Sequence, residues 1–209
     1  TPGSQPAPEE GSTGRATLVV RPCIHYLTGR VKAPAECTEN YACYRCPVHA
    51  SIAPSAEIRP APLGRPRART ASGYRVAEGY YYHFGHTWVQ IVHGKCVRIG
   101  IDDFAAKLFG IANAIEGLET GESLAQADVG YSLIRGGNQA PVLSPLSGRV
   151  LAINQRALEH PEVLLDDPYH DGWLLQLEPY WLKQESQGLY DVDESLDWME
   201  HEHRRLLQL

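Results

Sequence analysis

The hydrophobic pattern is clearest from Tyr80 onward, where short apolar runs are separated by polar and glycine residues. Two β-branched runs, at 87–92 and 96–101, flank a turn that contains Gly94. Paired runs of this kind around a glycine turn predict a β-hairpin.

A mainly β pattern continues beyond this hairpin. Asp102 and Asp103 can cap a short helix over 104–109. Further strands are predicted at 150–154 and 173–177, with glycine-marked turns between the short segments. Many short strands with little helix predict a compact β-sandwich or flattened barrel, extended by short helices.

Apolar residues near the C-terminus recur with a different period from those of the β-rich region. Between 195 and 209, apolar residues recur at steps of three and four positions, which predicts an amphipathic helix capped by Asp191 or Asp193. We assign 185–209 to this C-terminal α-helix and expect its apolar stripe to pack on the same chain. Binding of a partner is the alternative role for the stripe.

Three segments precede the β-rich region of 80–184. Residues 1–17 are rich in Pro, Gly, Ser, Thr and Glu, a composition that predicts a disordered leader. Residues 18–50 contain four cysteines and form a candidate metal-binding module. Residues 51–79 are rich in Pro and Arg, lack apolar periodicity and are predicted to form an extended linker.

Charge and composition narrow the class of partner. A formal net charge of −6 argues against nucleic acid or an anionic membrane surface as the partner. No apolar run approaches the ~20 residues of a membrane-spanning helix, so no membrane insertion is expected. The first residues lack the basic and apolar sections of a secretory signal. We therefore expect a cytoplasmic protein whose partners are proteins.

Four of the five cysteines are grouped as Cys23-x13-Cys37-x5-Cys43-x2-Cys46. Four thiolates suit a tetrahedral zinc ion or an iron–sulfur cluster. The module is too short to bury much apolar core, so bound metal would supply the free energy that folds it. The spacing favours a structural zinc ribbon, and a [4Fe–4S] cluster is the close alternative.

Other residues near these cysteines leave two alternatives open. His25 and His49 flank the outer cysteines and could replace one thiolate. The cysteines could also remain unpaired thiols, or the C-x-x-C pair could be a redox dithiol, although no βαβ pattern surrounds it. Three histidines at 83, 86 and 93 offer a weaker second metal candidate, with His86 interpreted as structural.

Several motifs occur in a fixed order within the β-rich region. They are His86-x-Trp88-Val89, Val97-x-Ile99-Gly100-Ile101-x-Asp103, Ser144-Pro145-Leu146-Ser147-Gly148-x-Val150, Asn154 and Asp167-Pro168-Tyr169-x-x-Gly172-Trp173-Leu174. In order, spacing and residue identity, this region resembles the H protein of the glycine cleavage system. The resemblance implies a lipoyl-type β-sandwich (a barrel-sandwich hybrid) of two small antiparallel sheets. In that family a lysine at a hairpin tip carries lipoate, whose arm moves an aminomethyl group and electrons between partner enzymes.

The lysine that the resemblance leads us to expect is missing. In the family it lies seven residues before the first Ser of the Ser-Pro-x-Ser-Gly motif, and counting back from Ser144 gives Gly137. No lysine occurs between Lys107 and Lys183, so no shift of the alignment restores one. Arg135 cannot replace it, because a guanidinium stays protonated and is a poor nucleophile. We therefore expect a bare glycine turn and no lipoate.

The sequence shows no catalytic constellation, since it has no phosphate loop, nucleophile elbow or dinucleotide fingerprint. We expect a non-enzymatic accessory or docking subunit of a larger complex of redox type, with a metal-stabilised N-terminal module. One alternative is an electron-transfer subunit with a [4Fe–4S] cluster on the four cysteines. Another is a carrier with a different attachment site, such as Cys96 or Lys107.

Overall fold

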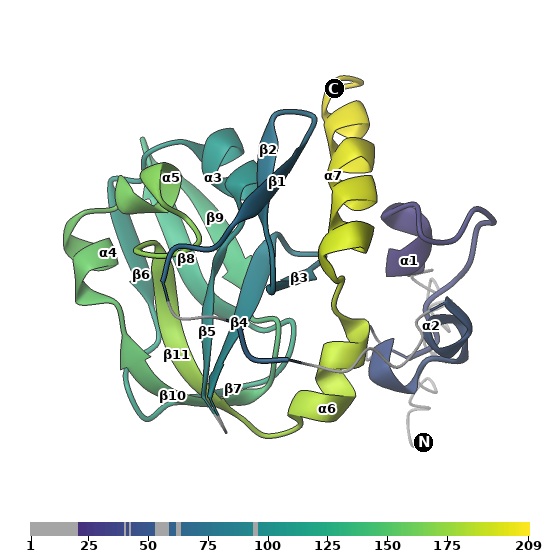
Figure 1. The fold of residues 1–209 in the computed structure, drawn as a ribbon, viewed down its shortest axis with the longest axis horizontal. Coiled ribbons are helices and arrows are strands. Elements are labelled where there is room, and N and C mark those ends of the chain that lie inside the picture. Colours follow the sequence, from purple (N-terminus) through teal and green to yellow (C-terminus); the bar gives the residue numbers. More distant parts are fainter. Residues whose placement is uncertain (1–20, 40, 42, 53–58, 62–63, 94–95) are drawn as a thin grey trace, which may run out of the picture.

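Two facing antiparallel sheets form the body of the protein, seen here in a computed structural model (Figure 1). The structure describes residues 21–39, 41, 43–52, 59–61, 64–93 and 96–209, so the leader expected at 1–17 lies outside the described residues. One sheet has the strand order β3 (Tyr81–His83), β4 (Thr87–His93), β5 (Cys96–Ile101), β11 (Trp173–Pro179), β10 (Gly148–Ile153) and β7 (Ser123–Leu124). The other has the order β6 (Ala114–Gly117), β8 (Val129–Arg135) and β9 (Asn138–Leu143).

The core lies between these two sheets. Alternating side chains of β4 and β5, such as Val89 and Val97, pack in one apolar cluster with Tyr131, Leu133 and Val142 of β8 and β9. Strand alternation explains this packing, because residues two apart point to the same face of a sheet. The mainly β sandwich and the hairpin at 87–101 are thus confirmed.

One glycine is required by close packing within the first sheet. A Cβ on Gly100 would lie 2.5 Å from the ring of Trp88, its cross-strand partner. Trp88 is fully buried, and its indole N–H donates to Ile101 O at 2.8 Å and to Pro168 O at 3.1 Å. Gly100 therefore leaves the space that this indole fills.

Three short helices surround the sheets: α3 (Asp103–Phe109), α4 (Gln155–Glu159) and α5 (Val163–Asp166). Asp102 caps α3, as predicted, by accepting a hydrogen bond from the Ala105 N–H at 2.8 Å. Next to this cap, the ring of His86 is stacked between Phe104 and Trp198. His86 therefore has a structural role, joining α3 to the C-terminal helix.

The linker predicted at 51–79 contains regular structure. Strands β1 (Ala68–Ala71) and β2 (Tyr74–Ala77) form an antiparallel hairpin that packs against α3 and the C-terminal helix. Only three of its side chains are buried hydrophobics, namely Ala71, Val76 and Ala77. With so few apolar residues among the arginines, the sequence shows no alternation of apolar and polar positions here. The prediction of an extended linker was therefore wrong for the residues of β1 and β2.

The C-terminal segment consists of α6 (Leu182–Glu185), a 3-10 turn η2 (Ser186–Gly188) and α7 (Val192–Leu206). A capping box between Asp191 and Glu194 starts α7, so Asp191 is the cap, as one of the two predicted alternatives had it. The segment assigned to one helix at 185–209 is helical in α7 only from Val192, and its first residues belong to α6 and η2. Trp198 and Met199 are buried in a second apolar cluster that includes Tyr82. The apolar stripe of this helix therefore packs on its own chain.

The N-terminal module lies on the far side of α7 from the sheets (Figure 1). It contains α1 (Ile24–Leu27), a 3-10 turn η1 (Cys43–Arg45) and α2 (Pro47–Ile52). Its link to the body includes the Tyr190 hydroxyl, which donates to Thr28 Oγ1 at 2.7 Å. In the described part of the chain, no helix is long and apolar enough to cross a bilayer.

Candidate functional site

The hairpin of β8 and β9 ends in a two-residue turn formed by Gly136 and Gly137. Arg135 and Asn138 are the last paired residues, and both glycines have positive φ angles, 54° and 80°. Positive φ at both central residues is typical of a type I′ hairpin turn and explains the glycines. The position where the resemblance implies a lysine is therefore the exposed tip of a hairpin.

Neighbouring residues hold this tip in place. The Gly136 N–H donates to Asn113 Oδ1 at 2.9 Å, and the Arg135 guanidinium donates to Phe109 O at the end of α3. A Cβ on either tip glycine would meet nothing within 4 Å, so the turn projects into open space. The hairpin thus presents an ordered tip with no reactive side chain.

An apolar hollow of about 260 Å³ lies beside this hairpin. Its lining comes from α3, β9 and neighbouring segments and includes Leu108, Phe109, Leu133, Ala140 and Pro141. The Leu108 side chain at its rim is 58% exposed. The region around the tip therefore combines a fixed backbone with accessible apolar surface.

The two alternative attachment sites are both engaged in other contacts. Lys107 Nζ lies 2.8 Å from Asp103 Oδ2 and donates to Gly73 O at 2.7 Å. Cys96 is half-buried with its sulfur 3.8 Å from Gln176 Oε1, and burial raises the pKa of its thiol. An amine held in an ion pair and a protonated thiol are both poor nucleophiles.

Backbone pairing arranges the two outer cysteines of the N-terminal module. Pro22 and Glu36 form an antiparallel bridge, in which Cys23 N donates to Ala35 O and Cys37 N donates to Arg21 O, both at 2.7 Å. Alternation along paired strands places Cys23 and Cys37 on the same face of this bridge. Cys23 is also the N-cap residue of α1, and it is 4% exposed.

The other two cysteines bracket the η1 turn. Cys46 N donates to Cys43 O at 3.0 Å, and Cys46 O accepts from Ala50 N as α2 begins. Burial first, and then the nearby thiols of Cys46, Cys37 and Cys23, raise the pKa of Cys43 to about 12. The four cysteines therefore share one region of the module.

The sulfurs of the four cysteines lie further apart than the sulfurs that bind a single metal ion. Within the described ranges, the group of potential ligands with all donor atoms within 4.8 Å of one another is Asp167, His170 and Asp171. No three of the four sulfurs meet that limit in the described chain. The structure thus places the four predicted ligands in one region, with their sulfurs further apart than around one ion.

The two histidines that flank the cysteines meet each other instead. His49 Nδ1 lies 3.1 Å from His25 Nε2, and the rings are stacked with centroids 4.9 Å apart. Both side chains are buried, and burial lowers the pKa of His25 to about 4 and also lowers that of His49. Among the described residues, His25 Nδ1 and His49 Nε2 have no hydrogen-bond partner.

Arg30 is a feature of this region that the sequence did not single out. Its guanidinium lies 3.9 Å from the ring centroid of Tyr190 and pairs with Glu194. The side chain is only 10% exposed, and its Nη1 has no hydrogen-bond partner in the part of the chain that the structure describes. An arginine between Gly29 and Val31 carries no motif, so only the fold reveals its position.

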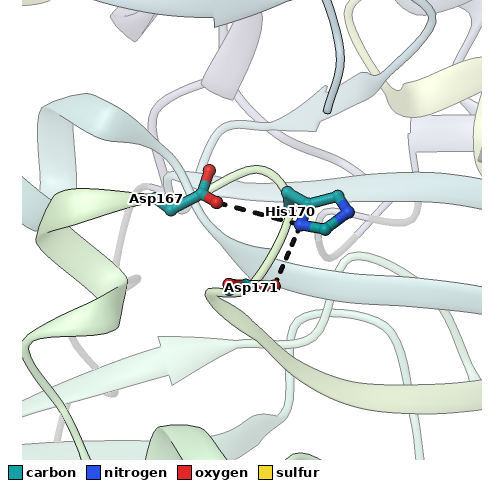
Figure 2. Close-up of side chains that lie close together, drawn as sticks. All are labelled: Asp167, His170 and Asp171. Carbon is teal, nitrogen blue, oxygen red and sulfur yellow. Dashed lines mark hydrogen bonds and ion pairs between the residues drawn. The ribbon is translucent and has the colours of Figure 1, made fainter. Parts of the chain in front are cut away.

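The cluster of Asp167, His170 and Asp171 lies in the loop between α5 and β11 (Figure 2). His170 Nδ1 is 2.9 Å from Asp171 Oδ1 and 3.8 Å from Asp167 Oδ2. Arg65 and Arg156 pair with these two carboxylates at 3.0 and 3.1 Å. Because arginines already balance both charges, the cluster stabilises the loop, and we assign it no ligand.

Comparison with known proteins gives a consistent match. The family model "Glycine cleavage H-protein" matches residues 80–202, which include most of α7. The probable glycine cleavage system H protein of Thermococcus kodakarensis is 32% identical over 126 residues, covering 60% of this chain and 93% of that protein. The H protein of Hydrogenovibrio crunogenus is 34% identical over 112 residues, 54% of this chain and 87% of that protein.

A solved H-protein structure from Mycobacterium marinum is 25% identical, with a TM-score of 0.45, and covers 48% of this chain and 84% of that one. The family model spans more than half of the described sequence and includes both sheets of the sandwich from β3 onward. This chain belongs to the glycine cleavage H-protein family.

Proposed function

We propose that this protein is a docking subunit that has kept the H-protein fold without a lipoyl arm. The observation that carries the proposal is the tip of the β8–β9 hairpin, where two glycines stand and no lysine lies between Lys107 and Lys183. Lipoate is held by an amide bond to a lysine amine. A hairpin without that amine is left with recognition as its function.

The contacts of other nucleophiles support this proposal over a carrier with a new attachment site. Lys107 is bound to Asp103 and Gly73, and Cys96 is half-buried with a raised pKa. Family members are carrier subunits and not catalysts, and this chain is not itself an enzyme. Its role is therefore to bind other proteins in a complex.

The surface beside the hairpin offers the contact area for such a partner. Leu108 and Ile111 are 58% and 52% exposed, and Leu108 lines the apolar hollow next to β9. Exposed apolar side chains around a concave surface are typical of protein-binding sites. The Arg135 and Asn113 contacts keep the glycine tip fixed at the edge of this surface.

The N-terminal module completes the proposal as a metal-binding unit on four thiolates. In its described part, the buried side chains are Cys23, His25, Thr28 and His49, and none of them is aliphatic or aromatic hydrocarbon. A module with no such core needs another source of folding free energy, which a zinc ion or an iron–sulfur cluster would supply. Free thiols also suit a reducing compartment such as the cytoplasm.

Purification of the tagged full chain from its native host tests the docking role. We expect one or more proteins to co-purify at fixed stoichiometry and to elute with it in size-exclusion chromatography. Leu108→Asp should release them, whereas Val129→Asp, which alters a similarly exposed apolar residue at the end of β8 away from the tip, should not. A strictly monomeric protein with no associated chain would contradict the proposal.

A further inference from the structure

We propose that the N-terminal module holds a [4Fe–4S] cluster on four thiolates, those of Cys23, Cys37, Cys43 and Cys46. This inference rests on the proposed metal-binding role and names the cofactor. Four observations carry it: the missing apolar core, the spacing of the sulfurs, a backbone hydrogen bond to sulfur, and a nearly buried arginine.

The interior of the module is polar. Among its described residues, the buried positions are two histidines, one threonine and one cysteine, and none of them belongs to either apolar cluster of the protein. Two ring nitrogens, His25 Nδ1 and His49 Nε2, are left without a partner there. Buried unsatisfied groups are rare in native proteins and require an explanation, such as a bound water or ion.

The spacing of the sulfurs distinguishes a cluster from a single ion. Around one tetrahedral zinc ion, with Zn–S bonds of about 2.3 Å, neighbouring sulfurs lie about 3.8 Å apart. In the described module no three sulfurs lie within 4.8 Å of one another, although all four lie near Cys43. In a [4Fe–4S] cluster each thiolate binds a different iron, so the four sulfurs stand further apart.

The pairing of the outer cysteines agrees with this wider spacing. Cys23 stands opposite Ala35, so Cys37 is its diagonal neighbour across the bridge. Diagonal neighbours on paired strands are roughly 7–8 Å apart at their Cα atoms. The backbone thus holds these two ligands on one face of the bridge, with their Cα atoms well separated.

Polar groups around the site suit a cluster with net negative charge. The Tyr41 N–H donates to Cys37 Sγ at 3.1 Å, and hydrogen bonds to ligand sulfurs tune the potential of iron–sulfur clusters. Arg30 of the module is nearly buried and pairs with Glu194, and among the described residues its Nη1 has no hydrogen-bond partner. A positive charge held there would stabilise both the cluster and its reduced state.

The module also has a fixed place on the body of the protein. The η1 turn approaches η2 so closely that a Cβ on Gly188 would lie 3.5 Å from the Cβ of Cys43. His201 Nε2 lies 3.2 Å from Leu27 O, which adds a contact between α7 and α1. A cluster in this module would therefore be held at a constant distance from the H-protein domain.

Anaerobic purification of the full chain, followed by metal and sulfide analysis, tests the proposal. We expect iron and acid-labile sulfide in equal amounts, about four of each per chain, and a visible absorption band that bleaches with dithionite. Cys43→Ser should lose this iron, while Cys96→Ser, which lies outside the module, should keep it. Arg30→Gln should keep the iron and lower the reduction potential.

The outcomes separate the cofactor from the wider proposal. One zinc per chain without sulfide, both as purified and after incubation with ferrous iron and sulfide, would overturn the cluster and leave the metal module in place. A module that stays folded with neither metal nor cluster, judged by hydrogen exchange of its amides, would overturn both. The docking role is judged independently by co-purification.

Discussion

The hydroxyl of Tyr190 donates a hydrogen bond to the hydroxyl of Thr28 at 2.7 Å, and this contact joins the N-terminal module to the C-terminal segment. The backbone of Tyr190 also pairs in both directions with that of Tyr82 in β3, at 2.9 and 2.7 Å. One residue thus connects the edge of the sheet, the C-terminal segment and the N-terminal module.

Tyr190→Phe is expected to loosen the module and leave the sheets intact. The variant removes one buried hydrogen bond, while Thr28 keeps its own bond to Ile24 O, so the cost should be about 1 kcal/mol. Tyr190→Ala also removes a buried ring and should cost about 3–5 kcal/mol. Urea unfolding and hydrogen exchange of the module amides measure both changes. Equal exchange in wild type and Tyr190→Phe would show that the contact does not hold the module.

His86 is expected to be needed for docking of α7. Its ring stacks between Phe104 and Trp198, with centroids 4.5 and 4.6 Å away, and its Nδ1 lies 2.9 Å from Asp102 Oδ2. His86→Asn tolerates the local φ of 58° but removes both stacks, and it should cost about 2–3 kcal/mol. Hydrogen exchange along α7 checks this. Unchanged protection there would contradict the structural role.

Two glycines should respond in opposite directions to substitution. Gly136→Asn should stabilise the protein by about 0.5 kcal/mol, because its Cβ meets nothing and Asn-Gly suits a type I′ turn. Gly100→Ala should destabilise it by about 1–3 kcal/mol, because its Cβ would lie 2.5 Å from the Trp88 ring. Each variant is the control for the other in urea unfolding, and a destabilising Gly136→Asn would show that the turn has another geometry.

His83 should make stability depend on pH. Burial first, and then the nearby His86, lower the pKa of His83 from 6.5 to about 3, and His83 Nδ1 accepts the Gly85 N–H at 3.2 Å. The unfolded chain therefore binds this proton at higher pH than the folded chain does. Stability from this group is present above pH 6.5 and is lost as pH falls below it, by up to about 1.4 kcal/mol per unit.

The variant His83→Gln isolates this contribution, because the other buried histidines contribute equally to the pH dependence of stability in both proteins. We expect its stability to fall less steeply than that of wild type between pH 6.5 and pH 5. Thermal unfolding across that range measures the two slopes. Parallel slopes would mean that folding does not lower the pKa of His83.

Local signals in the sequence accounted for much of the sheet structure. The hairpin at 87–101, the Asp102 cap and the strands around Val150 and Leu174 were predicted because each has a pattern that is local in the sequence. The motifs from His86 to Leu174 also pointed to the family that the comparison shows.

Features that depend on distant contacts were not visible in the sequence. The β1–β2 hairpin buries few apolar side chains, and its stability comes from packing on α3 and α7, including the Arg75 pair with Asp103 at 2.6 Å. The Tyr190–Thr28 contact joins residues 162 positions apart, and no periodicity signals it. The sequence showed that the four cysteines lie in one segment, but only the structure shows how far apart their sulfurs are.

The central claim, that the hairpin tip carries no lipoyl arm, is tested most directly by intact mass. The full chain and the variants Gly137→Lys and Gly137→Ala are expressed with a lipoate ligase and excess lipoate. We expect wild type and Gly137→Ala to keep the mass of the unmodified chain, and Gly137→Lys to gain one lipoyl group at the exposed tip. A lipoyl adduct on the wild-type protein would contradict the account.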